Sequence, residues 1–260
     1  MKIKIIFQRI NGNRIPLAYN HILVSFIYRT IEESNSEYSA FLHDHGYLHK
    51  GKNFKLFTFS LLQTQNARVK PPFLYINSPF IELYLSSPIK EWVLHFVNGL
   101  FTKNEIFLGG RCSSIERTIG MDFSIKKVET LENPDFTQTI RVKSLSPITI
   151  STATVENNKM KAIYLDYRES LFKENIRKNL INKHEILHNS RPANTDFDFS
   201  FDDYYIQKRQ GKISKLLDYN GTKIRGYTAP LSMWGNPDLV RLAYHAGLGD
   251  RGSMGFGCLV

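Results

Sequence analysis

The chain is poor in cysteine and has no long apolar stretch. Its 260 residues include only two cysteines, Cys112 and Cys258, which excludes a disulfide framework and a zinc site built on cysteine pairs. No apolar run approaches the ~18 residues of a membrane-spanning helix, and the amino-terminal residues lack the apolar segment of a signal peptide. We therefore expect a cytoplasmic protein with no membrane partner, in which both cysteines serve in packing.

Acidic residues are outnumbered by basic ones. The sequence has 34 Lys and Arg against 24 Asp and Glu, which gives a formal net charge of +10. Such a surplus favours polyanionic partners, either a nucleic acid or an anionic membrane surface. With 18 Phe and 13 Tyr, aromatic rings are also available to stack on bases. A basic surplus that only maintains solubility is the alternative, and we favour a nucleic acid over it.

The order of expected elements in the first half is β-α-β-β-α-β, which is typical of a ferredoxin-like domain. Helices are expected where apolar residues recur at helical spacing, and strands where they alternate. The expected elements are a strand at 2–8, a helix at 17–33, a strand at 55–62, a strand or bent hairpin arm at 74–87, a helix opened by Ser87 and Pro88, and one or two strands within 105–130.

The same order repeats after the Asn-Pro-Asp sequence at 133–135. We therefore predict an α+β protein with two tandem ferredoxin-like domains, at 1–133 and 134–260. No residue-level repeat links the halves; only the order of elements is shared. In the second half we expect strands at 139–150, 196–208, 222–234 and 254–260, a long helix at 165–188, and a short helix capped by Asn236, Pro237 and Asp238.

Five glycines lie within eleven positions near the end of the chain, in the sequence HAGLGDRGSMGFGCLV. Gly247, Gly249 and Gly252 spell G-x-G-x-x-G, but a dinucleotide site needs a strand before this motif and a helix after it. The expected order is the reverse, which argues against a nucleotide-dependent enzyme. Gly247 can end a helix in the left-handed conformation. For the other glycines two interpretations stay open: a loop that faces phosphate beside Arg251, or a loop packed tightly against the other domain.

The complete pattern resembles the CRISPR-associated protein six family, the repeat-cleaving endoribonucleases of the RAMP superfamily. The resemblance rests on G-L-G-x-x-x-S-M-G-F-G before the last strand, and on IPLAYNHILVSFIY, FLHDHGY and FKLFTFSLL in the first half. It implies a metal-independent ribonuclease that needs no cofactor and whose partner is CRISPR repeat RNA. In such enzymes the 2′-hydroxyl of the RNA attacks the adjacent phosphorus, leaving a 2′,3′-cyclic phosphate and a 5′-hydroxyl.

The resemblance also implies catalytic residues. The family's histidine corresponds to His43, in the polar segment 43–53 that we expect to be a loop, its helical tyrosine to Tyr28, and its lysine at the next strand to Lys55. This chemistry needs a base, an acid and positive charge beside the phosphate. We expect His43 to be the base or acid, Tyr28 and His45 its proton partners, and Lys55 the neutralising charge. His21 shares a helical face with Tyr28 and is a further candidate.

The histidines are also open to two other interpretations. His43, His45 and His49 could hold zinc, which accepts imidazole ligands, but no cysteine or carboxylate completes the set at a usual spacing, so we expect no metal. The histidines could also be no more than a solvated loop, which would be the preferred interpretation without the resemblance.

The expected RNA-binding residues lie mostly in the second half. Basic residues gather around a predicted hairpin with only Asp218 opposing them, and such a hairpin can follow the phosphates of an RNA stem; a solvated charged turn is the alternative. A catalytically inactive RNA-binding subunit of an effector complex stays open as a second function, with effector subunits or a second copy of the chain as further partners. The residues that we expect to bind RNA are Lys52, Lys208, Arg209, Lys212, Lys215, Lys223, Arg225, Gly247, Gly249, Arg251, Gly252 and Ser253.

Overall fold

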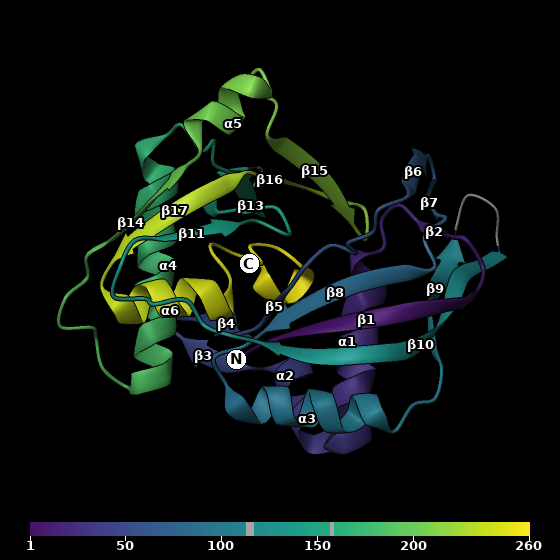
Figure 1. Cartoon of the computed structure of the whole chain (residues 1–260). Helices are drawn as coiled ribbons and strands as arrows, with labels where there is room; N and C mark the ends of the chain where they lie inside the picture. The colour runs from purple at the N-terminus through teal and green to yellow at the C-terminus, as the bar shows by residue number, and fades with distance from the viewer. Residues whose placement is uncertain (113–116, 157–158) are drawn as a thin grey trace.

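A computed structural model describes residues 1–112, 117–156 and 159–260, and its two main antiparallel sheets each carry helices on one face (Figure 1). The first sheet has the order β5-β8-β1-β10-β9, and α1 and α3 lie together beneath it. This is the ferredoxin-like order with the last strand doubled, as predicted. Its elements are β1 (Lys2–Asn11), α1 (Asn20–Ser34), β5 (Thr58–Phe59), β8 (Phe80–Ser86), α3 (Lys90–Phe101), β9 (Ile106–Cys112) and β10 (Arg117–Leu131).

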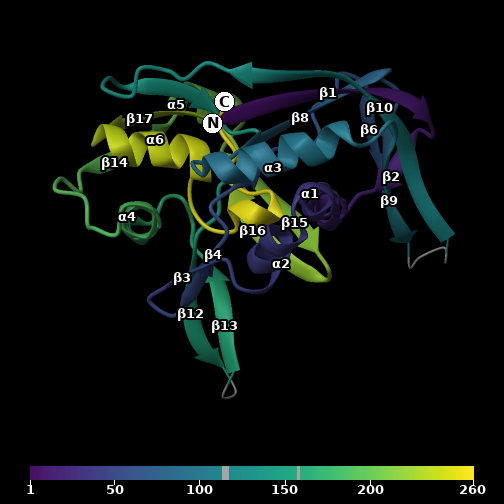
Figure 2. The same cartoon turned by 90° about the horizontal axis from the view of Figure 1, so that it is seen from below.

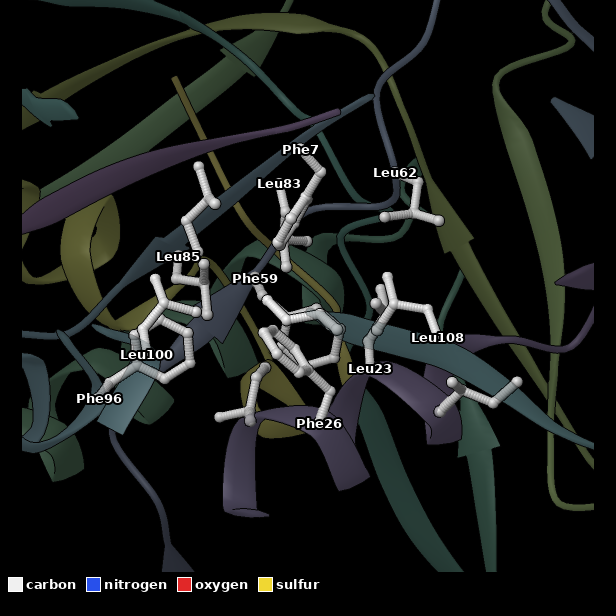
Figure 3. Packing of buried hydrophobic residues seen from close by; sticks show 14 of the residues in the cluster. Phe7, Leu23, Phe26, Phe59, Leu62, Leu83, Leu85, Phe96, Leu100 and Leu108 are labelled. Atoms are coloured by element: carbon white, nitrogen blue, oxygen red, sulfur yellow. The ribbon is translucent and has the colours of Figure 1, made fainter. Parts of the chain in front are cut away.

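The core of this half is built from apolar residues that alternate along the strands and recur at helical spacing along the helices. Alternate residues of β1 point to the same side of the sheet, so Phe7 faces the helices while its neighbours face away. Phe7 meets Phe26 of α1 edge to face, with ring centroids 6.1 Å apart, and Phe26 meets Phe96 of α3 in the same way. Figure 3 shows Leu83 of β8 packed into the same cluster.

The second sheet has the order β14-β17-β11, and the chain end lies beside β11. The backbone N–H of Lys143 donates to the carbonyl of Val260 at 2.6 Å, and that of Val260 donates back at 2.9 Å. The end of the chain therefore completes a second ferredoxin-like set. Its elements are β11 (Ile140–Lys143), α4 (Ser170–His188), β14 (Phe197–Phe201), β17 (Pro230–Gly235) and α6 (Pro237–Ala246).

Each half has its own apolar core, one built from residues up to Val128 and the other from Phe136 onward. These cores support a division at 133/134, which we retain as a proposal. The halves are also joined through buried groups. The fully buried Lys2 ammonium donates to the carbonyls of Tyr244 and Leu259, and the Thr58 hydroxyl donates to the carbonyl of Phe256 at 2.8 Å.

Several smaller elements extend from the two sheets. Figure 2 shows the β3–β4 and β12–β13 hairpins projecting in the same direction from the body of the molecule. None of the helices in the described ranges combines the length and apolarity needed to cross a bilayer. These elements are β2 (Arg14–Pro16), α2 (Ser36–Asp44), β3 (Tyr47–His49), β4 (Lys52–Phe54), β6 (Ala67–Lys70), β7 (Phe73–Ile76), β12 (Ser151–Glu156), β13 (Lys159–Tyr164), α5 (Asp203–Lys208), β15 (Ser214–Tyr219), β16 (Thr222–Tyr227) and the 3₁₀ turn η1 (Gly252–Met254).

The structure corrects two of the expected elements. The predicted loop at 43–53 is wrong, because His43 lies in the last turn of α2 and the β3–β4 hairpin follows it. The predicted strand at 196–208 ends at Phe201, because the Asp202 carboxylate accepts the N–H of Tyr205 at 2.7 Å and starts helix α5.

Other expected strands are shorter than predicted or are divided. The strand expected at 139–150 is only β11, and the one expected at 254–260 begins in the η1 turn. The expected strand at 74–87 is divided into β7 and β8 at Pro79, which has no N–H for a ladder. The strand at 55–62 shrinks to β5, and 222–234 divides into β16 and β17. Cys258 is buried as expected, and the side chain of Cys112 lies outside the described part of the chain.

Candidate functional site

Tyr28 and His43 are brought together by a tight turn between two helices. Asn35 ends α1 with its N–H on the carbonyl of Ile31, and its side chain accepts the N–H of Tyr38 to start α2. Helix α2 therefore folds back along α1, and the Ser39 hydroxyl donates to the carbonyl of Tyr28 at 3.1 Å. The rings of Tyr28 and His43 meet edge to face with centroids 5.6 Å apart.

These two rings line a groove between the helices, which we call the α1–α2 groove. It has a volume of ≈ 390 Å³ and is also lined by Ser25, Arg29 and Asp44. Burial raises the pKa of Tyr28, with a smaller contribution from Tyr219. Tyr28 therefore keeps its proton at neutral pH, and it can donate a hydrogen bond but is not available as a base.

Lys55 holds the end of α2. Its ammonium donates to the carbonyls of Leu42 and His43, the latter at 2.9 Å. A positive charge there is favourable, because carbonyls at a helix C-terminus lack partners and carry partial negative charge. Burial lowers the pKa of Lys55, and the nearby Asp44 carboxylate partly opposes this. Two of its three N–H groups thus donate to backbone carbonyls, a contact that the sequence did not predict.

The other two histidines proposed for proton transfer lie differently. His45 is exposed just beyond the end of α2, and its side chain makes no hydrogen bond within the described residues. His21 lies outside the α1–α2 groove, and its buried Nδ1 has no hydrogen-bond partner among the described residues. The structure therefore joins His43 to Tyr28 and Lys55, but it does not bring His21 into the same groove.

A larger cleft lies between the two halves, and we call it the central cleft. It has a volume of ≈ 940 Å³ and is lined by Lys52 to Phe57 on one side and by the glycine loop, Gly249 to Met254, on the other. Lys161, Lys178 and Lys183 also line it. Lys55 lines this cleft and its ammonium donates to the carbonyl of His43, whereas the side chains of His43 and Tyr28 line the separate α1–α2 groove.

Close packing accounts for two of the glycines that line this cleft. Gly249 has φ +92°, and a Cβ there would lie 2.2 Å from the carbonyl oxygen of Thr149. A Cβ on Gly252 would lie 2.6 Å from the carbonyl oxygen of Phe57, which belongs to the other half. Packing against the other half is therefore confirmed for Gly252. The prediction that Gly247 ends α6 in the left-handed conformation is wrong, because its φ is +83° but its ψ is 144°.

A buried lysine organises the start of this loop. The ammonium of Lys183, on α4, donates to the carbonyls of Ala246, Gly247 and Gly249 at 3.4, 2.7 and 3.0 Å. Burial lowers the pKa of Lys183 to about 8. Its donors satisfy the carbonyls of Ala246 and Gly247, which the end of α6 would otherwise leave unpaired, and that of Gly249 in the loop beyond. Sequence reasoning missed Lys183, because nothing in a mixed-charge helix marks one lysine as buried.

Arg251 and Ser253 also line the central cleft. Arg251 is a non-glycine residue at φ 60°, a backbone conformation that costs energy. Its guanidinium lies over the Tyr164 ring at 5.5 Å, and its buried Nε has no hydrogen-bond partner in the described ranges. The strained backbone and the unpaired donor make Arg251 the strongest candidate of the loop for contact with a phosphate.

The predicted basic hairpin exists as β15–β16, but its charges are distributed along it. Lys208 and Arg209 lie at α5, whereas Lys223 is paired with Asp218 at 2.7 Å near the tip. The pKa of Asp218 lies below its usual value, mainly through Lys223, then through the N–H of Gly221, and least through His21 of α1. The hairpin thus runs from α5 toward α1 (Figure 1), and Lys212, Lys215 and Arg225 are exposed along it.

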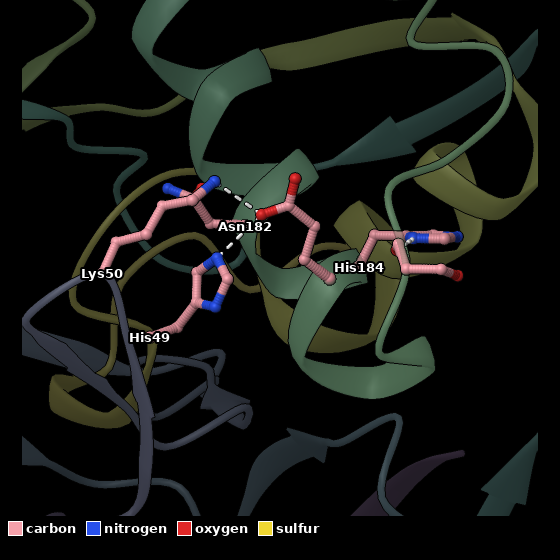
Figure 4. Close-up of polar contacts among 6 residues, drawn as sticks. His49, Lys50, Asn182 and His184 are labelled. Atoms are coloured by element: carbon pink, nitrogen blue, oxygen red, sulfur yellow. Dashed lines mark hydrogen bonds and ion pairs between the residues drawn. The ribbon is translucent and has the colours of Figure 1, made fainter.

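His49 has a partner other than a metal. Its Nε2 contacts the Glu185 carboxylate of α4 at 2.7 Å, and Lys50 contacts the same oxygen at 2.6 Å (Figure 4). Lys50 also donates to Asn182 at 3.2 Å. These contacts tie the β3–β4 hairpin, and with it Lys52, to the second half. The described residues contain no cluster of three or more His, Cys, Asp or Glu side chains suited to a metal.

Comparisons with known proteins agree on one family. Residues 131–260 match the family model "CRISPR associated protein Cas6, C-terminal", and residues 14–119 match "CRISPR-associated protein Cas6, N-terminal". The chain is 28% identical over 260 residues to a CRISPR-associated endoribonuclease Cas6 of Methanocaldococcus jannaschii, covering 100% of this chain and 92% of the relative.

Solved structures give the same result. A structure described as CRISPR associated protein Cas6 is 28% identical with a TM-score of 0.74, and the match covers 100% of this chain and 98% of that one. The structure of a Cas6-related gene product from Pyrococcus furiosus has a TM-score of 0.82 at 23% identity, covering 100% and 97% of the two chains. The tandem ferredoxin-like fold is therefore confirmed.

Proposed function

The chain belongs to the Cas6 family of CRISPR-associated proteins, and on that premise we propose that it is an endoribonuclease that processes CRISPR precursor RNA at its repeats. The observation that carries the proposal is the cluster of Tyr28, His43 and Lys55, which come from a helix, a second helix and a following segment and meet at the end of α2. A tyrosine, an imidazole and an ammonium within one cluster suit proton transfer at a phosphodiester.

The proposed reaction needs no metal. His43 takes the proton of the 2′-hydroxyl as the 2′-oxygen attacks the adjacent phosphorus. The bond from phosphorus to the 5′-oxygen breaks, and a proton supplied through Tyr28 or His45 neutralises that oxygen. The products are a 2′,3′-cyclic phosphate and a 5′-hydroxyl. The remaining N–H of Lys55 stabilises the negative charge that develops on the phosphate oxygens.

The proposed path of the RNA follows the positive charge of the second half. Lys52 and Arg251 contact phosphates in the central cleft, and the RNA strand lies along the backbone of the glycine loop, Gly247 to Ser253, whose shape is fixed by the close packing of Gly249 and Gly252. The β15–β16 hairpin supports a second contact through Lys212 and Lys215, whose exposed ammonium groups attract phosphates without reading sequence.

Incubating the protein with repeat RNA in EDTA tests the proposal. We expect a single cut per repeat, with a cyclic phosphate on one product and a 5′-hydroxyl on the other. Binding without cutting would instead support the alternative, an RNA-binding subunit without catalytic activity. Cutting that occurs only when a divalent cation is restored would contradict the proposed chemistry.

Reversing two charges on the hairpin should weaken RNA binding. In the Lys212→Glu, Lys215→Glu variant we expect the slope of log affinity against log salt to become shallower by roughly 1 to 2, because two phosphate contacts are lost. Lys90→Glu with Lys126→Glu changes the net charge equally at exposed positions of the first half. An equal loss of affinity in both variants would show that overall charge, and not the hairpin, attracts the RNA.

A further inference from the structure

The imidazole of His43 has one ring nitrogen engaged and one left open. Its Nδ1 lies 2.8 Å from Oδ1 of Asp44, the next residue in the chain. The two side chains are 72% and 61% exposed, so an incoming RNA can reach the other nitrogen, Nε2. Both residues line the α1–α2 groove together with Tyr28. The carboxylate is thus placed to orient the imidazole from the side away from the reacting nitrogen.

The backbone beneath this pair is fixed. His43 and Asp44 occupy the last turn of α2, where Lys55 binds the carbonyls of Leu42 and His43. The ring of Tyr28 meets the imidazole edge to face. The imidazole is therefore held by a ring on one side, by a carboxylate at Nδ1 and by a tethered helix end. Such a surface contact contributes little to stability; what it can set is the ring angle and which ring nitrogen carries the proton.

We propose that Asp44 is a positioning residue for His43: it accepts the N–H of Nδ1, so that the lone pair of the neutral imidazole lies on Nε2, facing the RNA. A carboxylate that orients a catalytic histidine acts through the tautomer and the ring angle, and it does not itself touch the substrate. The inference rests on the proposed function, because it assigns Asp44 a role in proton transfer by His43.

The charges around Asp44 are consistent with this role. The pKa of Asp44 lies below its usual value, first because of the hydrogen bond with His43 and then because of nearby positive charge, with His43 ahead of His45 and Lys55. The carboxylate therefore stays ionised at neutral pH and can accept from Nδ1. Its negative charge would repel a phosphate, and the nearby Lys55 ammonium offsets that repulsion.

The test is the Asp44→Asn variant. An amide can donate to Nδ1 and favour the tautomer with the proton on Nε2, so we expect the single-turnover cleavage rate to fall roughly 10- to 100-fold while the Kd for RNA is unchanged. Asp44→Glu should recover much of the rate, because a longer carboxylate can still accept from Nδ1. Glu37→Gln removes an exposed acid at the other end of α2 and should have no effect.

A spectroscopic measurement tests the same point without any cleavage. Ring nitrogen NMR of His43, assigned by comparison with His43→Ala, should show the proton on Nδ1 in the wild-type neutral imidazole and on Nε2 in Asp44→Asn. An unchanged tautomer, or a cleavage rate within two-fold of wild type, would overturn the inference. If His43→Ala itself still cut RNA normally, the proposed function of His43 would fail, whatever Asp44 does.

Discussion

Replacing His43 by alanine is expected to abolish RNA cleavage while leaving RNA affinity within a few-fold of the wild-type value. The imidazole is the group in the cluster suited to take and give a proton near neutral pH, so its removal should lower the single-turnover rate by at least roughly 10³-fold. The ring is exposed and supports no apolar core, so the variant should fold. Cleavage under single-turnover conditions and RNA binding at equilibrium measure the two effects separately.

A second histidine provides the control. His188 is exposed at the end of α4, outside both the α1–α2 groove and the central cleft, and His188→Ala should cut at the wild-type rate. An unaffected rate in His43→Ala would remove His43 from catalysis. Loss of binding in proportion to the loss of cutting would instead make His43 a contact residue.

Replacing Gly249 by alanine is expected to destabilise the protein more than the same change at a turn. An alanine at φ +92° is strained, and its Cβ would lie 2.2 Å from the Thr149 carbonyl oxygen. Strain and overpacking together should lower the free energy of unfolding by roughly 2 to 5 kcal/mol. Because the Gly249 carbonyl also accepts from Lys183, the shift should disturb the whole glycine loop and weaken RNA binding.

Gly211→Ala separates the two causes. Gly211 also has a positive φ, +74°, but a Cβ there would have no atom within 4 Å, so only the backbone strain applies. Urea denaturation of both variants measures the difference in unfolding free energy. Equal destabilisation at the two positions would show that the close approach of Gly249 to Thr149 contributes nothing.

The order of elements could be predicted because apolar periodicity is a strong local signal. The apolar residues that alternate in β1 and those that recur at helical spacing in α1 are buried in the structure, as predicted. Prediction failed where one polar side chain decides the local structure. The Asp202 cap converts the end of an alternating stretch into α5, and the Asn35 cap gives α2 where polar residues suggested a loop.

The candidate site could be predicted only from its residue types and from the resemblance to a known family. The contact of Tyr28 with His43, and of Lys55 with the end of α2, agrees with the expected cluster, while their roles remain proposals. The roles of Lys183 and Asp44 could not be predicted from the sequence, because they arise from partners that the fold supplies. A lysine becomes buried, and a carboxylate meets a ring nitrogen, only once helices α4 and α2 are in place.

The central claim is that the RNA supplies its own nucleophile to the imidazole at the end of α2. The most direct measurement compares the cleavage in EDTA of two repeat RNAs, identical except for a 2′-deoxyribose at the nucleotide before the cut. We predict that the natural RNA is cut and that the substituted RNA binds equally well but stays intact. Cleavage of both RNAs at the same rate would contradict the account.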